Sequence, residues 1–185
     1  MATLVPPFTR ETAVQKLKTA QKLWNTCDPA RVAAAYTPDS NWRNRHWFVK
    51  GRKEIEELLT MKWNREKSYR LRKELFAFEN RRIGGPDRLG GYEGEERWLG
   101  LIAVQFWYEY QDKDDGMKWK RCYGLEDWTF DEKDGGKMRK RMMSGNDVLL
   151  GRDGDGTAVP EEGIEGRWYL DGVDVEDVDI TEKHY

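Results

Sequence analysis

The sequence of 185 residues has only two cysteines and two histidines, and it has no apolar run near the ~20 residues that a membrane-spanning helix needs. Cys27 and Cys122 are too few for a disulfide framework, and no CxxC or Cys/His cluster indicates zinc. The N-terminus lacks a basic segment followed by an apolar one, so no secretory signal is predicted. We therefore expect no metal or other cofactor, no membrane association and a cytoplasmic location.

Charge is abundant but unevenly distributed. Charged residues make up 36% of the chain, yet nine Trp, eight Tyr and six Phe indicate a folded core, because disordered chains are poor in aromatic residues. Residues 151–185 contain three basic and eleven acidic residues, which leaves 29 basic and 23 acidic residues in the remainder. We expect one domain over residues 1–150 and an acidic C-terminal extension over 151–185, whose aromatic segment 166–170 docks on the body or on a second subunit.

A basic body with an acidic tail is also the pattern of a nucleic-acid binder that masks itself. No known nucleic-acid motif accompanies the aromatic and basic residues, and the glycine pairs Gly84-Gly85 and Gly90-Gly91 match neither phosphate-binding pattern. No nucleic-acid partner is therefore expected.

The order of periodic segments predicts an α+β fold. Apolar residues at three- and four-residue spacing predict a helix over 10–25, and Asp28-Pro29 and Gly51 introduce two more. Strands are expected over 41–49, 69–80, 101–110, 119–130 and 138–148, with a long glycine-rich loop over 84–100. Helices over one face of an antiparallel sheet leave the other face open, which predicts a homodimer through that face.

Opposite charges suggest a register for the last hairpin. Placing Phe130 opposite Met138 sets Asp127 against Arg141 and Arg121 against Asp147. In this register Glu126, Trp128 and Asn146 share the other face of the hairpin.

Several stretches resemble the nuclear transport factor 2-like superfamily. They are Trp24-Asn25, Asp28-Pro29, residues 35–40 and the segment that begins at Gly51. Within that superfamily, Trp42-Arg43-Asn44-Arg45, residues 123–131 and Asn146-Asp147 resemble an uncharacterised SnoaL-like, ketosteroid-isomerase-like subfamily. The resemblance covers residues 6–150, interrupted by the glycine-rich loop as an insertion.

This resemblance implies a cone-shaped, cystatin-like fold in which a curved antiparallel sheet wraps on N-terminal helices. The mouth of such a cone holds a hydrophobic small molecule in isomerases, dehydratases and cyclases, whereas other members are adaptors or dimerisation modules. In ketosteroid isomerases a catalytic Asp lies eight residues after the aromatic residue that ends the second helix. Counting from Tyr36 gives Asn44, and an amide cannot abstract a proton at neutral pH.

Two other residues are candidates for proton transfer. Alternation along the strand 41–49 places Trp42, Asn44 and His46 on one face, so His46 could act as a general base. Glu126 lies among aromatic residues that would raise its pKa. The alternatives are a structural histidine and a carboxylate paired with an Arg or Lys of the cone.

The sequence thus predicts a cofactor-independent isomerase, lyase or cyclase that acts on a hydrophobic carbonyl compound. Glu126 and His46 are the predicted catalytic residues. The predicted ligand-binding residues are Trp42, Asn44, Tyr108, Trp128 and Asn146. The alternative function is a non-catalytic dimerisation or adaptor module, in which the same residues only fill the cone.

Overall fold

Capping residues start the first two helices where the sequence predicts them. The computed structural model describes residues 4–85 and 94–185. Thr9 accepts a hydrogen bond from the backbone N–H of Thr12, and Asp28 accepts one from that of Arg31 ahead of the helix-compatible Pro29. The helices are α1 (Arg10–Trp24), α2 (Pro29–Ala33) and α3 (Gly51–Arg65).

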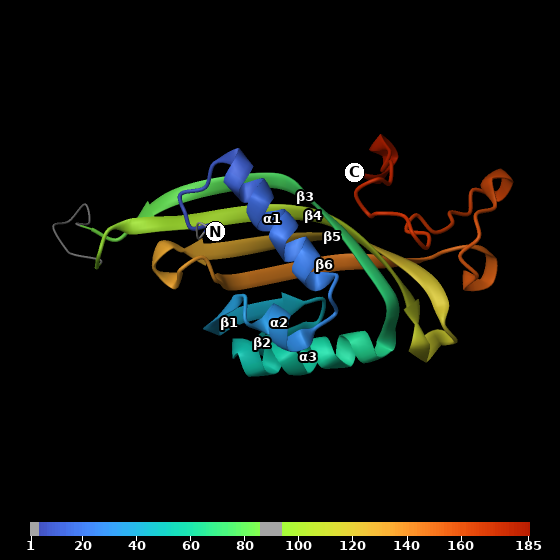
Figure 1. The fold of residues 1–185 in the computed structure, drawn as a ribbon, viewed down its shortest axis with the longest axis horizontal. Helices are drawn as coiled ribbons and strands as arrows, with labels where there is room; N and C mark the ends of the chain where they lie inside the picture. The colour runs from blue at the N-terminus through green and yellow to red at the C-terminus, as the bar shows by residue number, and fades with distance from the viewer. Residues whose placement is uncertain (1–3, 86–93) are drawn as a thin grey trace.

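Six strands form one curved sheet in the order β2-β1-β6-β5-β4-β3. Neighbouring strands are antiparallel except for the parallel pair of β1 and β6. In Figure 1, α1 crosses the sheet while α3 runs beside β1 and β2. The strands are β1 (Tyr36–Asn44), β2 (Trp47–Lys50), β3 (Glu66–Ile83), β4 (Arg97–Asp112), β5 (Lys118–Asp131) and β6 (Met138–Leu149). The predicted α+β architecture is confirmed.

The predicted strand over 41–49 is in fact two strands. Arg45 has a left-handed backbone conformation, with φ 59°, and this residue turns the chain back so that β2 pairs with β1. β1 also begins earlier than the predicted strand, at Tyr36, and only two residues separate it from the end of α2. The glycine-rich loop is shorter than predicted because β3 reaches Ile83 and β4 begins at Arg97; residues 86–93 of it lie outside the described residues.

The predicted hairpin register is correct only at its end. Phe130 pairs with Met138, but a bulge between Thr129 and Phe130 shifts the rest by one residue. Cross-strand charge pairing predicted the wrong partners, because a bulge leaves no clear trace in the charge pattern. Arg141 is consequently opposite Trp128, and Arg121 is opposite Val148.

The register shift also changes which residues face inward. The inner face of the sheet and the helices enclose an aromatic core that includes Trp24, Trp42, Trp63, Phe106, Tyr108 and Trp128. Asn146 is exposed and lies opposite Tyr123 on the other face. The prediction that Asn146 shares the face of Glu126 is therefore wrong.

The C-terminal extension packs on the outer face of the sheet, as its aromatic segment led us to expect (Figure 1). The buried carboxylate of Glu109 accepts hydrogen bonds from the backbone N–H groups of Trp168 and Tyr169 at 2.7 and 3.1 Å. The same carboxylate accepts two hydrogen bonds from Arg121, at 2.7 and 2.9 Å. The extension thus covers part of the face that was predicted to form a homodimer, and the homodimer stays a prediction.

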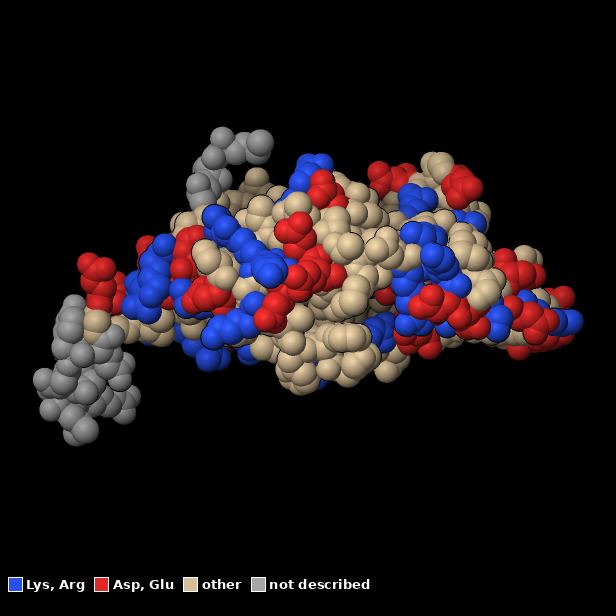
Figure 2. Space-filling model, turned by 90° about the horizontal axis from the view of Figure 1, so that it is seen from below, with Lys and Arg blue, Asp and Glu red and all other residues tan. Residues whose placement is uncertain are grey.

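The described surface is densely charged but mixed in sign. On the face shown in Figure 2, acidic and basic side chains lie intermixed on both sides of an uncharged central area, and neither kind forms a continuous stripe. Among the residues that the structure describes, no helix is both long and apolar enough to cross a membrane. Within the same residues, no group of three or more His, Cys, Asp and Glu side chains is arranged to hold a metal ion.

Candidate functional site

A buried charge cluster occupies the centre of the cone. Glu126 Oε1 accepts hydrogen bonds from Lys73 Nζ at 2.8 Å and from Arg141 Nη2 at 2.6 Å. Its second oxygen accepts one from Trp128 Nε1 at 2.6 Å. The three charged residues are at most 4% exposed. They come from β3, β5 and β6, whose alternate positions project into the cone.

This environment keeps Glu126 ionised. Burial raises the pKa of its carboxyl, but Arg141 and Lys73 lower it more strongly, and the resulting pKa is about 2. The sequence suggested a raised pKa, and the structure gives the opposite direction, because Lys73 and Arg141 reach the carboxylate from other strands. The alternative that the sequence left open, a carboxylate paired with an Arg or Lys of the cone, is the one found here. Burial lowers the pKa of Lys73 to about 8, although Glu126 opposes that shift.

The cluster carries more positive than negative charge. Lys73 and Arg141 share a single carboxylate, so the three groups have a net charge of about +1 when Lys73 is protonated. Arg141 Nε and Nη1 have no hydrogen-bond partner among the described residues. The guanidinium instead lies 4.6 and 4.8 Å from the ring centres of Trp24 and Trp42, where cation–π attraction offsets part of its desolvation.

The interior around this cluster is nearly filled. A cavity of only about 10 Å³ remains between Asn44, Tyr108 and Glu126, which is about the space for one water molecule. The hollow that the resemblance implied is therefore occupied here by side chains of the protein. A larger ligand fits in pockets that open from the sides of the cone, and two of these are lined by predicted site residues.

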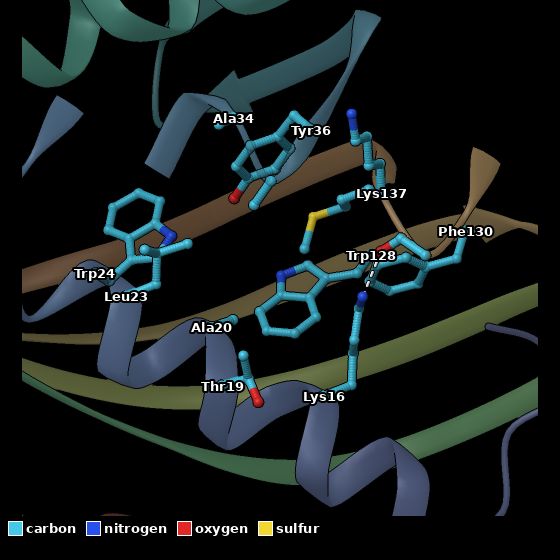
Figure 3. A pocket seen from close by; sticks show the side chains of 13 residues that line it. Lys16, Thr19, Ala20, Leu23, Trp24, Ala34, Tyr36, Trp128, Phe130 and Lys137 are labelled. Atoms are coloured by element: carbon cyan, nitrogen blue, oxygen red, sulfur yellow. Dashed lines mark hydrogen bonds between the residues drawn. The ribbon is translucent and has the colours of Figure 1, made fainter. Parts of the chain in front are cut away.

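The first of these, which we call the apolar pocket, has a volume of about 250 Å³ and lies between α1, the start of β1 and the β5–β6 hairpin (Figure 3). Its walls include the aromatic side chains of Trp24, Tyr36, Trp128 and Phe130. Three alanines also line the pocket, and their short side chains leave space between helix and sheet. They are Ala20, Ala34 and Ala35.

Lys16 places an ammonium group beside the aromatic wall of the apolar pocket. Its Nζ donates a hydrogen bond to the carbonyl oxygen of Gly136 and lies 5.0 Å from the ring centre of Phe130 (Figure 3). Burial lowers the pKa of Lys16 to about 8, so the ammonium form still predominates at neutral pH.

The second, which we call the polar pocket, has a volume of about 400 Å³ and lies between the end of α3 and the β1–β2 turn. Asn44, His46, Lys62 and Glu66 are among the residues that line it. Burial raises the pKa of the Glu66 carboxyl, and the adjacent ammonium of Lys62 opposes the shift. Lys62 also donates a hydrogen bond to the hydroxyl of Tyr108 at 3.2 Å.

The predicted site residues are thus divided among different places. Trp128 lines the apolar pocket, whereas Asn44 and the exposed His46 line the polar one. Tyr108 and Glu126 border the small internal cavity. Trp42 is buried against Trp24 and Tyr36, and Asn146 lies on the outer face.

Most charged residues of these sites were not predicted, among them Lys16, Glu66, Lys73 and Arg141. The sequence did indicate that Lys73 faces inward, because at two-residue spacing along β3 it shares a face with Tyr69, Leu71 and Leu75. Lys16 is three residues after Ala13 and four before Ala20 on α1, and thus lies beside the buried stripe. Glu66 and Arg141 gave no such signal. Their surroundings depend on the exact end of α3 and on the β5–β6 bulge.

The chain has a cystatin-like fold with aromatic residues facing its interior, and this is the fold that the resemblance implied. A LinA type 2 hexachlorocyclohexane dehydrochlorinase has a TM-score of 0.57 and 15% identity, over 88% of this chain and 95% of that one. A putative scytalone dehydratase from Novosphingobium aromaticivorans has a TM-score of 0.56 and 10% identity, over 75% and 85%. A cystatin-like domain of unknown function from Nostoc punctiforme has a TM-score of 0.52 and 16% identity, over 74% and 78%.

The chain belongs to the family described as protein of unknown function DUF1348, which matches residues 6–88 and 99–155. A search of curated proteins found no match. The two enzymes named above share the fold with this chain. Because their sequence identity to it is low, the similarity shows the fold alone.

Proposed function

We propose that the protein binds a small apolar molecule in the apolar pocket between α1 and the β5–β6 hairpin. The observation that carries this proposal is a pocket of about 250 Å³ with aromatic and aliphatic walls and two lysines, of which Lys16 is half-buried. Ligand pockets typically combine such walls with a few polar groups that orient the ligand. The volume is below the roughly 300–1,000 Å³ of pockets for drug-sized molecules. The ligand is therefore a single ring or a short chain.

Two further observations support this function. The filled interior leaves the side pockets as the places where a ligand fits without displacing Trp24 or Trp128. Proteins of the same fold include a putative scytalone dehydratase and a hexachlorocyclohexane dehydrochlorinase, whose substrates are small organic molecules.

A one-ring probe and a variant that places a side chain in the pocket test the proposal together. We expect 4-ethylbenzyl alcohol, a neutral one-ring probe, to shift the backbone amide resonances of Leu23, Ala35 and Met138 in ¹H–¹⁵N spectra. Ala20→Phe places a ring in the pocket and is expected to abolish these shifts. Ala30→Phe is the control, because Ala30 is exposed on α2 and does not line the pocket. Equal shifts in both variants would show that the probe binds elsewhere.

A second candidate function, proton transfer at the polar pocket, is favoured by the raised pKa of Glu66. Perturbed carboxyls in pockets are candidates for general bases, and the predicted Asn44 and His46 line the same pocket. A cofactor-independent isomerase or lyase removes a hydrogen next to a carbonyl group in its first step.

Exchange in D₂O measures this step directly. We expect the protein to accelerate deuterium exchange at the α-carbons of cyclohexanone, and we expect Glu66→Gln to slow that exchange at least about tenfold. His46→Ala tests the prediction that His46 acts as a general base. Lys133→Met changes an exposed residue of the β5–β6 turn, which does not line the polar pocket, and serves as the control. Exchange no faster than in protein-free buffer would reject this function.

A further inference from the structure

The charge at the wall of the apolar pocket is positive. The charged side chains that line it are Lys16 and Lys137, and none of its described lining residues is acidic. Neither lysine forms a salt bridge with a described carboxylate. Among the residues that the structure describes, the Lys16 ammonium contacts the carbonyl oxygens of Leu4 and Gly136 and the Phe130 ring. A half-buried ammonium without a counter-ion is an unusual feature of an apolar pocket.

The buried charge cluster of Lys73, Glu126 and Arg141 adds to the positive charge at the pocket. Trp24 and Trp128 line the pocket, and each of these rings also lies close to a buried cation, while Trp128 Nε1 donates a hydrogen bond to Glu126. Arg141 is 4.6 Å from the centre of the Trp24 ring, and Lys73 Nζ is 5.3 Å from that of Trp128. Glu126 compensates only one of the two charges. Charge in such a poorly solvated environment is screened weakly, so the surplus acts within the pocket.

We propose that the ligand of the apolar pocket is an apolar monocarboxylate. This inference rests on the proposed function and specifies its ligand class. The hydrocarbon part packs between α1 and Trp128, and the carboxylate accepts a hydrogen bond from Lys16 Nζ.

The chemistry of the pocket favours a carboxylate over other polar groups. A charge-assisted hydrogen bond to an ammonium is about twice as strong as a neutral one, which favours an anion over an alcohol or amide. A dianionic phosphate needs several donors at once, whereas the two lysines of the pocket are unequal: Lys16 is half-buried beside the aromatic wall, and Lys137 is exposed at the rim. The carboxylate also provides the missing counter-ion of Lys16.

A pair of isosteric probes tests the inference. We expect 4-ethylbenzoate to bind about tenfold more tightly than 4-ethylbenzamide, measured by titration of backbone amide shifts at low ionic strength. Lys16→Met should reduce this ratio to about one by weakening the benzoate alone, because the neutral side chain keeps the packing. Lys137→Met, at the exposed rim of the same pocket, should change the ratio less than about threefold. Lys16→Gln is a second variant should Lys16→Met fail to fold.

Each result distinguishes the inference from the function on which it rests. If neither probe binds, the proposed function is wrong. If the amide binds as tightly as the benzoate, or if the preference for the benzoate persists in both Lys16 variants, the carboxylate inference is wrong. The proposed function, binding of an apolar molecule in this pocket, is retained in that case. Benzoate shifts centred on Arg45 and His46 would place the anion in the polar pocket and would also overturn it.

Discussion

Glu126→Gln is expected to lower the free energy of unfolding by about 3–5 kcal/mol, because it leaves two buried cations without a counter-charge. The side chain is 4% exposed and accepts hydrogen bonds from Lys73, Arg141 and Trp128. Glutamine has the same shape but only one acceptor oxygen and no charge. Urea unfolding at pH 7 measures the difference.

Lys73→Met provides the matched control for this prediction. It removes one of the two cations and leaves a neutral pair of Glu126 and Arg141. Methionine has a similar length and fits among the rings of Trp24, Phe106 and Trp128. We expect a change of at most about 1 kcal/mol, in either direction, since removing surplus buried charge is often neutral or stabilising. A larger loss in Lys73→Met than in Glu126→Gln would contradict the surplus-charge interpretation.

Glu109→Ala is expected to release the C-terminal extension and to destabilise the protein by about 3–5 kcal/mol. Glu109 is 1% exposed, and it joins Arg121 of β5 to the backbone of Trp168 and Tyr169. The substitution leaves a buried guanidinium and two amide N–H groups without their acceptor, although Arg121 keeps Glu165. Hydrogen exchange at the amides of Trp168 and Tyr169 reports the release.

Glu161→Ala is the control for the extension. Glu161 is an exposed acidic residue of the same segment, and its replacement should leave the exchange of both amides unchanged. Should Trp168 and Tyr169 stay as protected in Glu109→Ala as in the unmodified protein, the extension is held mainly by its other contacts. These include the hydrogen bond from Arg70 to the carbonyl of Leu170 and that from Trp107 Nε1 to the carbonyl of His184.

Local patterns predicted the architecture well, since helix periodicity and strand alternation are properties of neighbouring residues. Trp42, Tyr108 and Trp128 are buried, as their positions in alternating segments indicate. Alternation also identified Glu126 as an inward carboxylate. It could not show that Lys73 and Arg141 reach that carboxylate from other strands.

The candidate pockets were harder to predict from the sequence than the architecture. The space of the apolar pocket exists because Ala20 and Ala35 are small where α1 passes the start of β1. Nothing within either segment shows that the two lie opposite each other. The one-residue bulge beside Phe130 moved Asn146 to the outer face, and bulges depend on pairing geometry more than on residue type.

The parallel pairing of β1 with β6 has a consequence for how the chain reaches its native state. Tyr36 pairs with Met138 and Asn44 with Met143, so the early strand finds its neighbour only after almost the whole domain has been synthesised. Until then the hydrogen-bonding edge of the β1–β2 hairpin has no native neighbour. Contacts between such distant parts of a chain slow folding, because a long loop must close before they form. Closure of the sheet by β6 is therefore expected to be a late event, preceded by the local pairing of β3, β4 and β5.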